Sequence, residues 1–413
     1  MKHEARPSGP SSQGLSGSQF WIDEEFRLAK VSNDVVIIGI GETPVGDLPG
    51  LTSVDIQARA VALALQDAGL TVHDLDGLIN QDPYCEPNSM FALTLCEYIG
   101  ASVTWCQTID VGGMASSITM LQSAVWAIEA GQCEMVAVVF GENFRTGRPP
   151  ASHGFVAMPA GAEEWEVPFG VQGAVIPYAM IAQRFMHETG ATSADFGEVA
   201  VVMRKHASLN ENAILRTPIT LDDYMASRMI ADPLRLLDCS IPSDGGGAFI
   251  LTTKDRARKM NANGVGIRSI AMKASHNSIV AIPNISEYPI KAAGTDAFES
   301  AGLGPSDIDV FLCHDAFTVS VLLVLEALGF AKPGESGEYM RSGAATLGGR
   351  CPINPHGGLL SQAHAGGIFH PVEAVRQLRG GAGVRQVENA RHAMISGNGG
   401  MFGVSAAMIM EKV

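Results

Sequence analysis

The sequence has no long apolar run and no basic stripe, and each absence excludes a class of protein. No stretch of about 18 apolar residues occurs in the 413 residues, which excludes an ordinary membrane-spanning helix. Lys and Arg number 28 against 43 Asp and Glu, a formal net charge of −15. Nucleic acid and anionic membrane surfaces attract cationic proteins, so we expect neither as a partner.

Paired cysteine motifs are also missing. The seven cysteines are odd in number and scattered, with no Cys-x-x-Cys pair: Cys85, Cys96, Cys106, Cys133, Cys239, Cys313 and Cys351. Disulfide frameworks and structural zinc sites need regular spacing, so we expect reduced thiols and no bound metal. Residues 1–5 are mildly basic but no apolar stretch follows them, so no secretory signal is expected. Together these features predict a cytoplasmic protein.

Strands and helices are expected to alternate after an N-terminal extension. Residues 1–32 are rich in Pro, Ser and Gly and are expected to be flexible, because they cannot bury enough apolar surface to offset the entropy of ordering. The run Val35–Gly41 consists of β-branched residues and two glycines, which is typical of a strand buried on both faces. A helix is expected over Ser53–Ala68, with Thr52 or Ser53 as its N-cap and Gly69 as its stop.

The same alternation continues to the end of the chain and predicts an α/β fold. Further strands are expected at 103–109, 134–140, 310–313, 392–396 and 404–410, and further helices at 115–130, 319–328 and 368–379.

Two pairs of segments indicate an internal duplication. Six of fifteen positions are identical between Ala64–Leu78 and Ala297–Phe311, and Ala124–Gly131 has a similar partner in Ala374–Gly381. Helix–Gly–strand junctions resemble one another in many proteins, which is the alternative explanation. The common order favours two related halves, 33–260 and 261–413, with an inserted cap at about 141–240 on the first. We expect an active site at their junction.

Two histidines near the C-terminus are candidate acid/base residues. His314 follows a short apolar strand, and His364 lies in a loop of small residues that runs into a helix. An imidazole titrates near neutral pH, so a pair of them suits proton transfer, although either residue alone could be a buried structural histidine. The glycines of 396–400 permit close backbone approach to a ligand or form a tight turn before the last strand.

Several motifs in order give the chain a family resemblance. These are Glu142, Leu236–Ser240, His314–Phe317, Asn354–Gly358, Ala363–Ala365 and Ser396–Gly400. Over about residues 33–413 the chain resembles the sterol-carrier-protein-type branch of the thiolase superfamily. The resemblance implies a thiolase-like fold, in which two duplicated βαβαβαββ halves form five layers with an inserted loop domain. It also implies a homodimer.

The departures from the family pattern concern the sulfur chemistry. The resemblance places Met114, or Gly113 after a one-residue slip, where a thiolase carries its nucleophilic cysteine, and neither forms a thioester. Ser116 and Ser117 are not obvious substitutes. The second family cysteine is replaced as well, by Ala316 or at Ser396. The remaining family positions are the oxyanion-binding backbone of Met114, Gly113, Gly399 and Gly400, and the supporting residues Asp315, Asn354 and Ser396.

Cysteine-lacking, thiolase-like aldolases of bacterial steroid side-chain degradation are the most similar branch in these features. Their two acid/base tyrosines correspond to His314 and His364 here. The resemblance implies retro-aldol cleavage of a β-hydroxyacyl-CoA by a histidine pair, in which either imidazole serves as the base. Coenzyme A is then part of the substrate and no cofactor is bound covalently. A small partner subunit with a zinc ribbon and a CoA-binding OB-fold is also implied.

Two other functions remain open at this point. One is a conventional thiolase or acyltransferase that uses another cysteine, such as Cys313 or Cys351. The other is a non-catalytic subunit that binds acyl-CoA. The acyl group is equally open between steroidal, aromatic and short-chain types. Four basic residues of the insert are candidates for the CoA phosphates or are simply solvated charges: Arg145, Arg148, Arg204 and Lys205.

Overall fold

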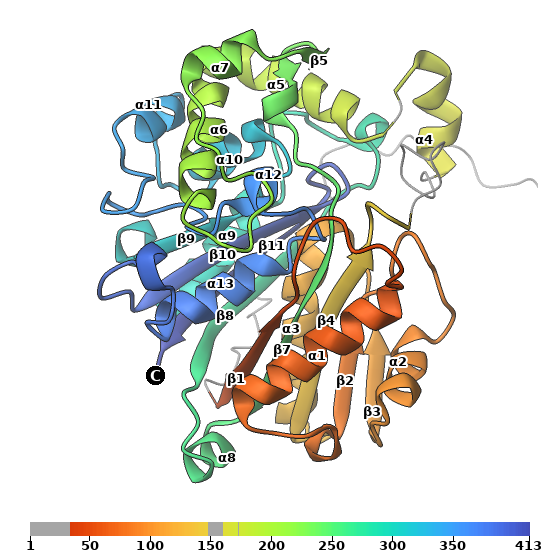
Figure 1. Cartoon of the computed structure of the whole chain (residues 1–413). Helices are drawn as coiled ribbons and strands as arrows, with labels where there is room; N and C mark the ends of the chain where they lie inside the picture. The colour runs from red at the N-terminus through yellow and green to blue at the C-terminus, as the bar shows by residue number, and fades with distance from the viewer. Residues whose placement is uncertain (1–33, 148–159, 172) are drawn as a thin grey trace, which may run out of the picture. The chain divides into compact units, whose positions relative to one another are not determined.

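The computed structural model describes residues 34–147, 160–171 and 173–413, and these alternate strands with helices as expected (Figure 1). The predicted flexible extension at 1–32 lies outside the described residues. The strands are β1 (Val35–Glu42), β2 (Gly77–Asn80), β3 (Trp105–Thr108), β4 (Met135–Asn143), β7 (Asp244–Thr253), β8 (Val265–Ala274), β9 (Val310–Cys313), β10 (His392–Gly399) and β11 (Val404–Lys412). A separate pair consists of β5 (Met229–Ala231) and β6 (Leu234–Arg235).

The strand order shows the duplication directly. The nine-stranded sheet runs β3-β2-β4-β7-β1-β8-β11-β10-β9, so the first five strands and the last four follow the same order outward from the β1–β8 pair. β2 pairs in parallel with β3, whereas β9 pairs at the matching place with the single residue Ile353, through a parallel bridge from Phe311. The edge strand of the first half is thus reduced to one residue in the second.

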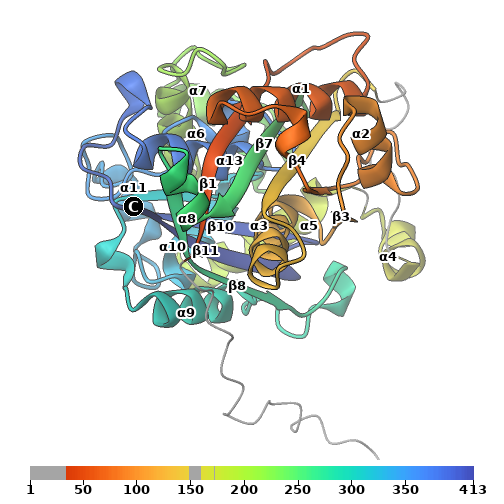
Figure 2. The same ribbon diagram turned by 90° about the horizontal axis from the view of Figure 1, so that it is seen from below.

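Helices separate and cover the two parts of the sheet in five layers (Figure 2). α3 (Gly113–Glu129) and α13 (Phe369–Leu378) lie between them, in a core cluster that draws residues from strands of both halves. α1 (Ser53–Ala68), α2 (Phe91–Ile99) and the short α8 (Lys254–Lys259) belong to one side, and α9 (Ile290–Ala301) and α10 (Thr318–Ala327) cover the other. This arrangement is the predicted thiolase-like fold.

The predicted helix caps account for several element boundaries. Thr52 accepts a hydrogen bond from the backbone of Asp55, and Asp55 in turn accepts one from the Thr52 backbone, which starts α1 where the sequence predicts it. α1 ends at Gly69 and α9 ends at Gly302, both in the left-handed conformation that favours glycine. The two ends lie 233 residues apart, which is the offset of the sequence repeat.

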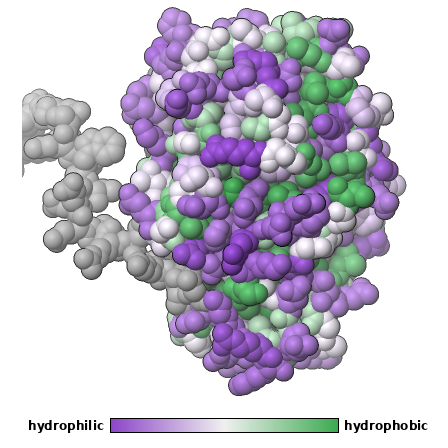
Figure 3. Space-filling view, turned by 90° about the vertical axis from the view of Figure 1, so that its left-hand side faces the viewer, coloured by the Kyte–Doolittle hydropathy of each residue, from purple (hydrophilic) through white to green (hydrophobic). Residues whose placement is uncertain are grey.

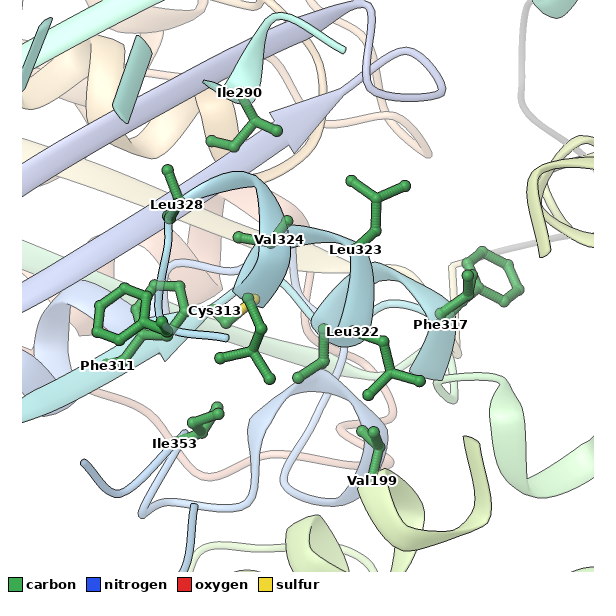
Figure 4. Packing of buried hydrophobic residues seen from close by; sticks show 14 of the residues in the cluster. Val199, Ile290, Phe311, Cys313, Phe317, Leu322, Leu323, Val324, Leu328 and Ile353 are labelled. Atoms are coloured by element: carbon green, nitrogen blue, oxygen red, sulfur yellow. The ribbon is translucent and has the colours of Figure 1, made fainter. Parts of the chain in front are cut away.

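The inserted segment packs on the second half, which differs from the expected cap on the first. It contains α4 (Ala160–Trp165), η2 (Val167–Phe169), α5 (Val175–Thr189), α6 (Ser193–Ala207), α7 (Leu221–Ala226) and η3 (Leu236–Asp238). The apolar side of α6 faces α10, α11 (Ser336–Arg341) and α12 (Gly358–Ser361). Figure 4 shows Val199 of α6 close to Leu322 of α10. α6 and α10 belong to one core because the apolar face of each helix is buried against the other.

The remaining features of the fold concern its compactness, the length of its helices and its surface. The predicted halves 33–260 and 261–413 are not separate compact bodies, because all described residues belong to one compact unit. Of the helices described, none is long and apolar enough to cross a bilayer. The face in Figure 3 carries mostly hydrophilic side chains, with apolar residues in scattered groups between them.

Candidate active site

A cavity of about 760 Å³ lies where the two halves and the insert meet. His314 and His364 both line it, so the fold brings together the two histidines that the sequence singled out. The α3 start contributes Gly112 and Gly113, and the end of β10 contributes Gly399. A cavity that combines titratable groups with backbone amides is a typical place for chemistry.

Asn354 fixes the end of β9, directly before His314. Its side-chain oxygen accepts a hydrogen bond from the Cys313 N–H and its side-chain nitrogen donates one to the Cys313 carbonyl, each at 2.8 Å. The Asn354 backbone adopts a φ of 48°, a left-handed conformation that Asn tolerates better than most residues. Below, Phe311 and Cys313 pack among Leu322, Val324 and Leu328 of the following helix and turn (Figure 4). His314 therefore emerges from a rigid base.

The His314 imidazole is held in the neutral state. Its side chain is 5% exposed, and burial is the main reason that its pKa is lowered to about 3. His364 and His370 lower the pKa further, whereas a hydrogen bond with the Asn398 side chain opposes them. Asn398 also donates to the Tyr178 hydroxyl at 3.0 Å, and Tyr178 stacks on Phe317. His314 is consequently a poor base near neutral pH.

Asp315 and Ser396 support this part of the site from outside the cavity. The Asp315 carboxylate is fully buried, accepts the Leu359 backbone N–H at 2.8 Å and bonds to His370 Nε2 at 3.1 Å. It thereby ties the start of α12 to the segment that carries His314. The Ser396 carbonyl accepts the His314 backbone N–H at 3.0 Å. Neither side chain lines the cavity, so both hold the backbone in place.

His364 is the more accessible of the two imidazoles. It lies in the loop between α12 and α13, and its side chain is half-buried. The Ser240 hydroxyl lies 2.8 Å from His364 Nδ1, and the backbone around His364 is bonded to Ser243. Ser240 also lines the cavity, directly after the motif Leu236–Cys239. A hydroxyl on Nδ1 fixes the ring orientation.

The start of α3 offers no nucleophile. The Met114 side chain is fully buried beneath Gly367, where a Cβ would lie 2.7 Å from it, and Met114 does not line the cavity. Gly113, Gly399 and Gly400 do line it, and the two glycine segments contact each other closely. β10 runs as far as Gly399, so the expected glycine-rich turn is mostly strand.

Both serines that follow are structural, as the sequence suggested. Ser116 Oγ bonds to Asp110 at 3.1 Å and to the Val111 N–H at 3.0 Å. Ser117 is fully buried in α3, and its hydroxyl has no hydrogen-bond partner among the described residues.

Several groups in the cavity were not identified from the sequence, among them a further imidazole, that of His276. Tyr84 follows β2, Tyr178 lies on α5, and Asp110 precedes α3. Glu142, quoted only as a motif residue, also lines the cavity and accepts the Cys85 N–H at 2.7 Å. Tyr84 lies in the loop that follows the buried parallel strand β2, and site residues often lie in such loops, so this placement could have identified it.

The cysteines offered as alternative nucleophiles lie elsewhere. No cysteine is among the described residues that line the cavity. Cys313 and Cys351 are almost fully buried, and burial raises the pKa of both thiols, for Cys351 to about 12. A buried, protonated thiol is a poor nucleophile.

Two of the four basic residues suggested for phosphate contacts are engaged with other groups. Arg204 is buried and donates to Ser361 at 3.2 Å, and Arg145 pairs with Asp47. Lys205 is exposed, and Arg148 lies outside the described residues. Within the described ranges, no group of three or more His, Cys, Asp or Glu side chains is arranged to hold a metal ion.

Comparison with known proteins places the chain and its fold in a family. The family model "Thiolase C-terminal domain-like" matches residues 271–412. The 17-hydroxy-3-oxo-4-pregnene-20-carboxyl-CoA lyase of Mycobacterium tuberculosis is 35% identical over 385 residues, which cover 90% of this chain and 98% of the relative. The chain belongs to the thiolase superfamily.

Two further matches show that relatives of this chain differ in their named activities. An acetyl-CoA acetyltransferase of Methanothermobacter thermautotrophicus is 33% identical over 389 residues, or 92% of this chain and all of the relative. A solved structure named "Ltp2-ChsH2(DUF35) aldolase" superposes with a TM-score of 0.84 at 33% identity, over 93% of this chain and 99% of that chain. The relatives are thus enzymes of both lyase and acyltransferase type.

Proposed function

We propose that this thiolase-superfamily member is an acyl-CoA C–C lyase that cleaves a β-hydroxyacyl-CoA by a retro-aldol reaction. One observation carries the proposal: imidazoles line the cavity, those of His314 and His364 among them, and no thiol is among its described lining residues. Thiolysis needs a sulfur that holds the acyl group, whereas retro-aldol cleavage needs only a base and an oxyanion-binding site. The names of the lyase and aldolase relatives support the same reaction class.

The substrate brings its own coenzyme A in this proposal, and no cofactor is bound covalently. A base removes the proton from the β-hydroxyl group, and the oxygen electrons form a carbonyl as the Cα–Cβ bond breaks. The electron pair of that bond moves into the thioester as an enolate, whose Cα then takes a proton. The products are an aldehyde or ketone and the shortened acyl-CoA, and the abstracted proton is returned.

The asymmetry of the two histidines assigns their roles. His314 has a pKa of about 3, so its imidazole is a weak base that stays unprotonated near neutral pH. It acts as a neutral hydrogen-bonding group toward the substrate. His364 is half-buried, lines the cavity and has its Nδ1 next to Ser240. We assign the base to His364, with Ser240 as its positioning residue.

The proposal extends to partners. The structure named for Ltp2 and ChsH2 pairs a protein similar to this one with a DUF35 subunit. We infer that this chain also works in a heteromeric complex, with a small zinc-ribbon and OB-fold subunit that binds the CoA portion. We infer a homodimer as well, supported by β3, which forms an open edge of the sheet.

Conventional thiolysis is the second candidate, because an acetyl-CoA acetyltransferase is 33% identical over nearly the whole chain. The positions of Cys313 and Cys351 count against it. A non-catalytic acyl-CoA-binding role is the third candidate, and the absent nucleophile is compatible with it.

The test is an incubation of the purified protein, with and without its partner, with matched β-hydroxyacyl-CoA and β-ketoacyl-CoA substrates. Each is run without free CoA and then with it. Carbonyl products from the hydroxy substrate in the absence of free CoA support the lyase. Cleavage of the keto substrate that strictly requires free CoA supports thiolysis, and binding of both without any product supports the non-catalytic role.

A further inference from the structure

Tyr84 places a phenol at the start of α3, where the cavity wall belongs to the first half. The side chain follows β2 and lines the cavity beside Gly112 and Gly113. Its hydroxyl accepts a hydrogen bond from Gln81 Nε2 at 3.0 Å, and the backbone N–H of Gly113 also acts on it electrostatically, which lowers its pKa. Gly113 is the first residue of α3, so the phenol covers the positive end of a 17-residue helix.

The phenolic proton of Tyr84 has no acceptor among the described residues. A phenol can both accept and donate a hydrogen bond, and Gln81 occupies the oxygen as a donor to it. The proton is therefore available to an acceptor that enters the cavity, and the Gln81 donor polarises the O–H bond toward it.

Tyr84 also keeps that proton. Burial raises the pKa of its hydroxyl well above the ordinary value of a tyrosine, and the negative charges of Asp110 and Glu142 raise the pKa further. A phenol in this environment donates a hydrogen bond without transferring its proton. The raised pKa favours the role of a stationary hydrogen-bond donor.

The backbone connects this phenol to the histidine side of the cavity. A Cβ on Gly113 would lie 2.4 Å from the Asn398 carbonyl oxygen, so only glycine permits the contact. The Asn398 side chain bonds in turn to His314. Tyr84 and His314 thus approach the cavity from opposite halves, with Gly113 and Asn398 between them.

The geometry points to Tyr84 as a catalytic residue that donates a hydrogen bond to the thioester oxygen of a bound acyl-CoA. This inference rests on the proposed function. As the Cα–Cβ bond breaks, the thioester oxygen gains negative charge, and the phenol donor strengthens its bond to that oxygen while it keeps its proton.

A pair of non-reactive ligands tests this role without turnover. Octanoyl-CoA carries the thioester oxygen, and S-octyl-CoA has a methylene group in place of the carbonyl. We expect Tyr84→Phe to weaken octanoyl-CoA binding about tenfold and to leave S-octyl-CoA binding within about twofold, measured by calorimetry with the protein and its partner subunit. Tyr98→Phe is the matched control, because the Tyr98 side chain is exposed, bonds to Asp55 and does not line the cavity.

The outcomes separate this role from the proposed function. A wild-type protein that binds neither ligand overturns the acyl-CoA proposal, and the Tyr84 role with it. A Tyr84→Phe variant that loses both ligands equally, or neither, overturns the Tyr84 role alone. In turnover of a β-hydroxyacyl-CoA, we expect Tyr84→Phe to raise KM about tenfold, in line with the weaker ligand binding, and to lower kcat about 100-fold, because the bond strengthens in the transition state.

Discussion

The two halves of the molecule place different residues at matching positions around one cavity. The position after β2 is Gln81, and the position after β9, 233 residues later, is His314. The start of α3 carries Met114, and the position 250 residues later, before α13, is His364. In both pairs the second half supplies the imidazole and the first half a residue that does not titrate.

The difference teaches that the duplicated fold fixes where side chains project, and that each half then specialises. Gln81 donates to the Tyr84 hydroxyl and to Asp110, so it organises hydrogen-bond donors at the start of α3. His314 and His364 bring groups that can bind or exchange a proton. In this arrangement the first half stabilises charge and the second half moves the proton. Substitutions that copy a residue from one half to the other test that division.

We expect the largest effect when His364, the proposed base in the second half, is replaced by the residue type at the matching position of the first half. His364→Met copies Met114 and removes the base, so we expect cleavage of a β-hydroxyacyl-CoA to fall about 1,000-fold, within the range for general-base loss. Steady-state kinetics measure the loss. Binding of S-octyl-CoA serves as the control and should stay within a few-fold. Cleavage within tenfold of wild type would place the base elsewhere.

His314→Gln makes the corresponding exchange after the strand, since Gln81 occupies the matching position. Glutamine keeps a hydrogen-bonding group but changes its geometry, so we expect cleavage to fall about 100-fold. His314 is already neutral above about pH 4, because its pKa is about 3. The pH profile of kcat should therefore keep its acid limb in the variant. Loss of that limb would show that His314, and not His364, is the titrating base.

Ser240→Ala probes the support of His364. The Ser240 hydroxyl lies 2.8 Å from His364 Nδ1, and its removal frees the imidazole to rotate or change tautomer. We expect a loss of about tenfold in kcat with a shifted acid limb of the pH profile. Ser117→Ala is the matched control, because that hydroxyl is buried without a described partner. A loss of equal size in both variants would indicate a general effect of serine removal.

The sequence predicted the fold and the histidine pair because both depend on local patterns. Thr52, Gly69 and the buried run of β1 define elements through their own chemistry. Tyr84 escaped notice because its importance depends on Gly113, which is distant in sequence and reaches it only through the fold. The placement of α6 on the second half was missed for the same reason, since its apolar face is compatible with either half.

The buried histidine also predicts a pH dependence of stability. The unfolded chain binds a proton at His314 near pH 6.5, but the folded protein does not until about pH 3. The unfolding free energy therefore falls as the pH drops through this window, and the contribution is complete above it. At pH 5, His314→Gln should reduce the slope of unfolding free energy against pH by about 1.4 kcal/mol per pH unit. Denaturant titrations from pH 7 to pH 4.5 measure it, and an unchanged slope would show that His314 is charged when folded.

The smallest effect is expected from restoring sulfur to the first half. Met114→Cys puts a thiol at the position where the thiolase pattern has its nucleophile, but the Met114 side chain is buried beneath Gly367 and does not line the cavity. The new thiol should neither react with iodoacetamide in the folded protein nor form an acyl adduct with octanoyl-CoA, as measured by intact mass. An acyl adduct in Met114→Cys would mean that the first half still presents its helix start to the substrate. The different roles of the two halves would then result from the single residue at position 114, and not from the packing of the side chains around it.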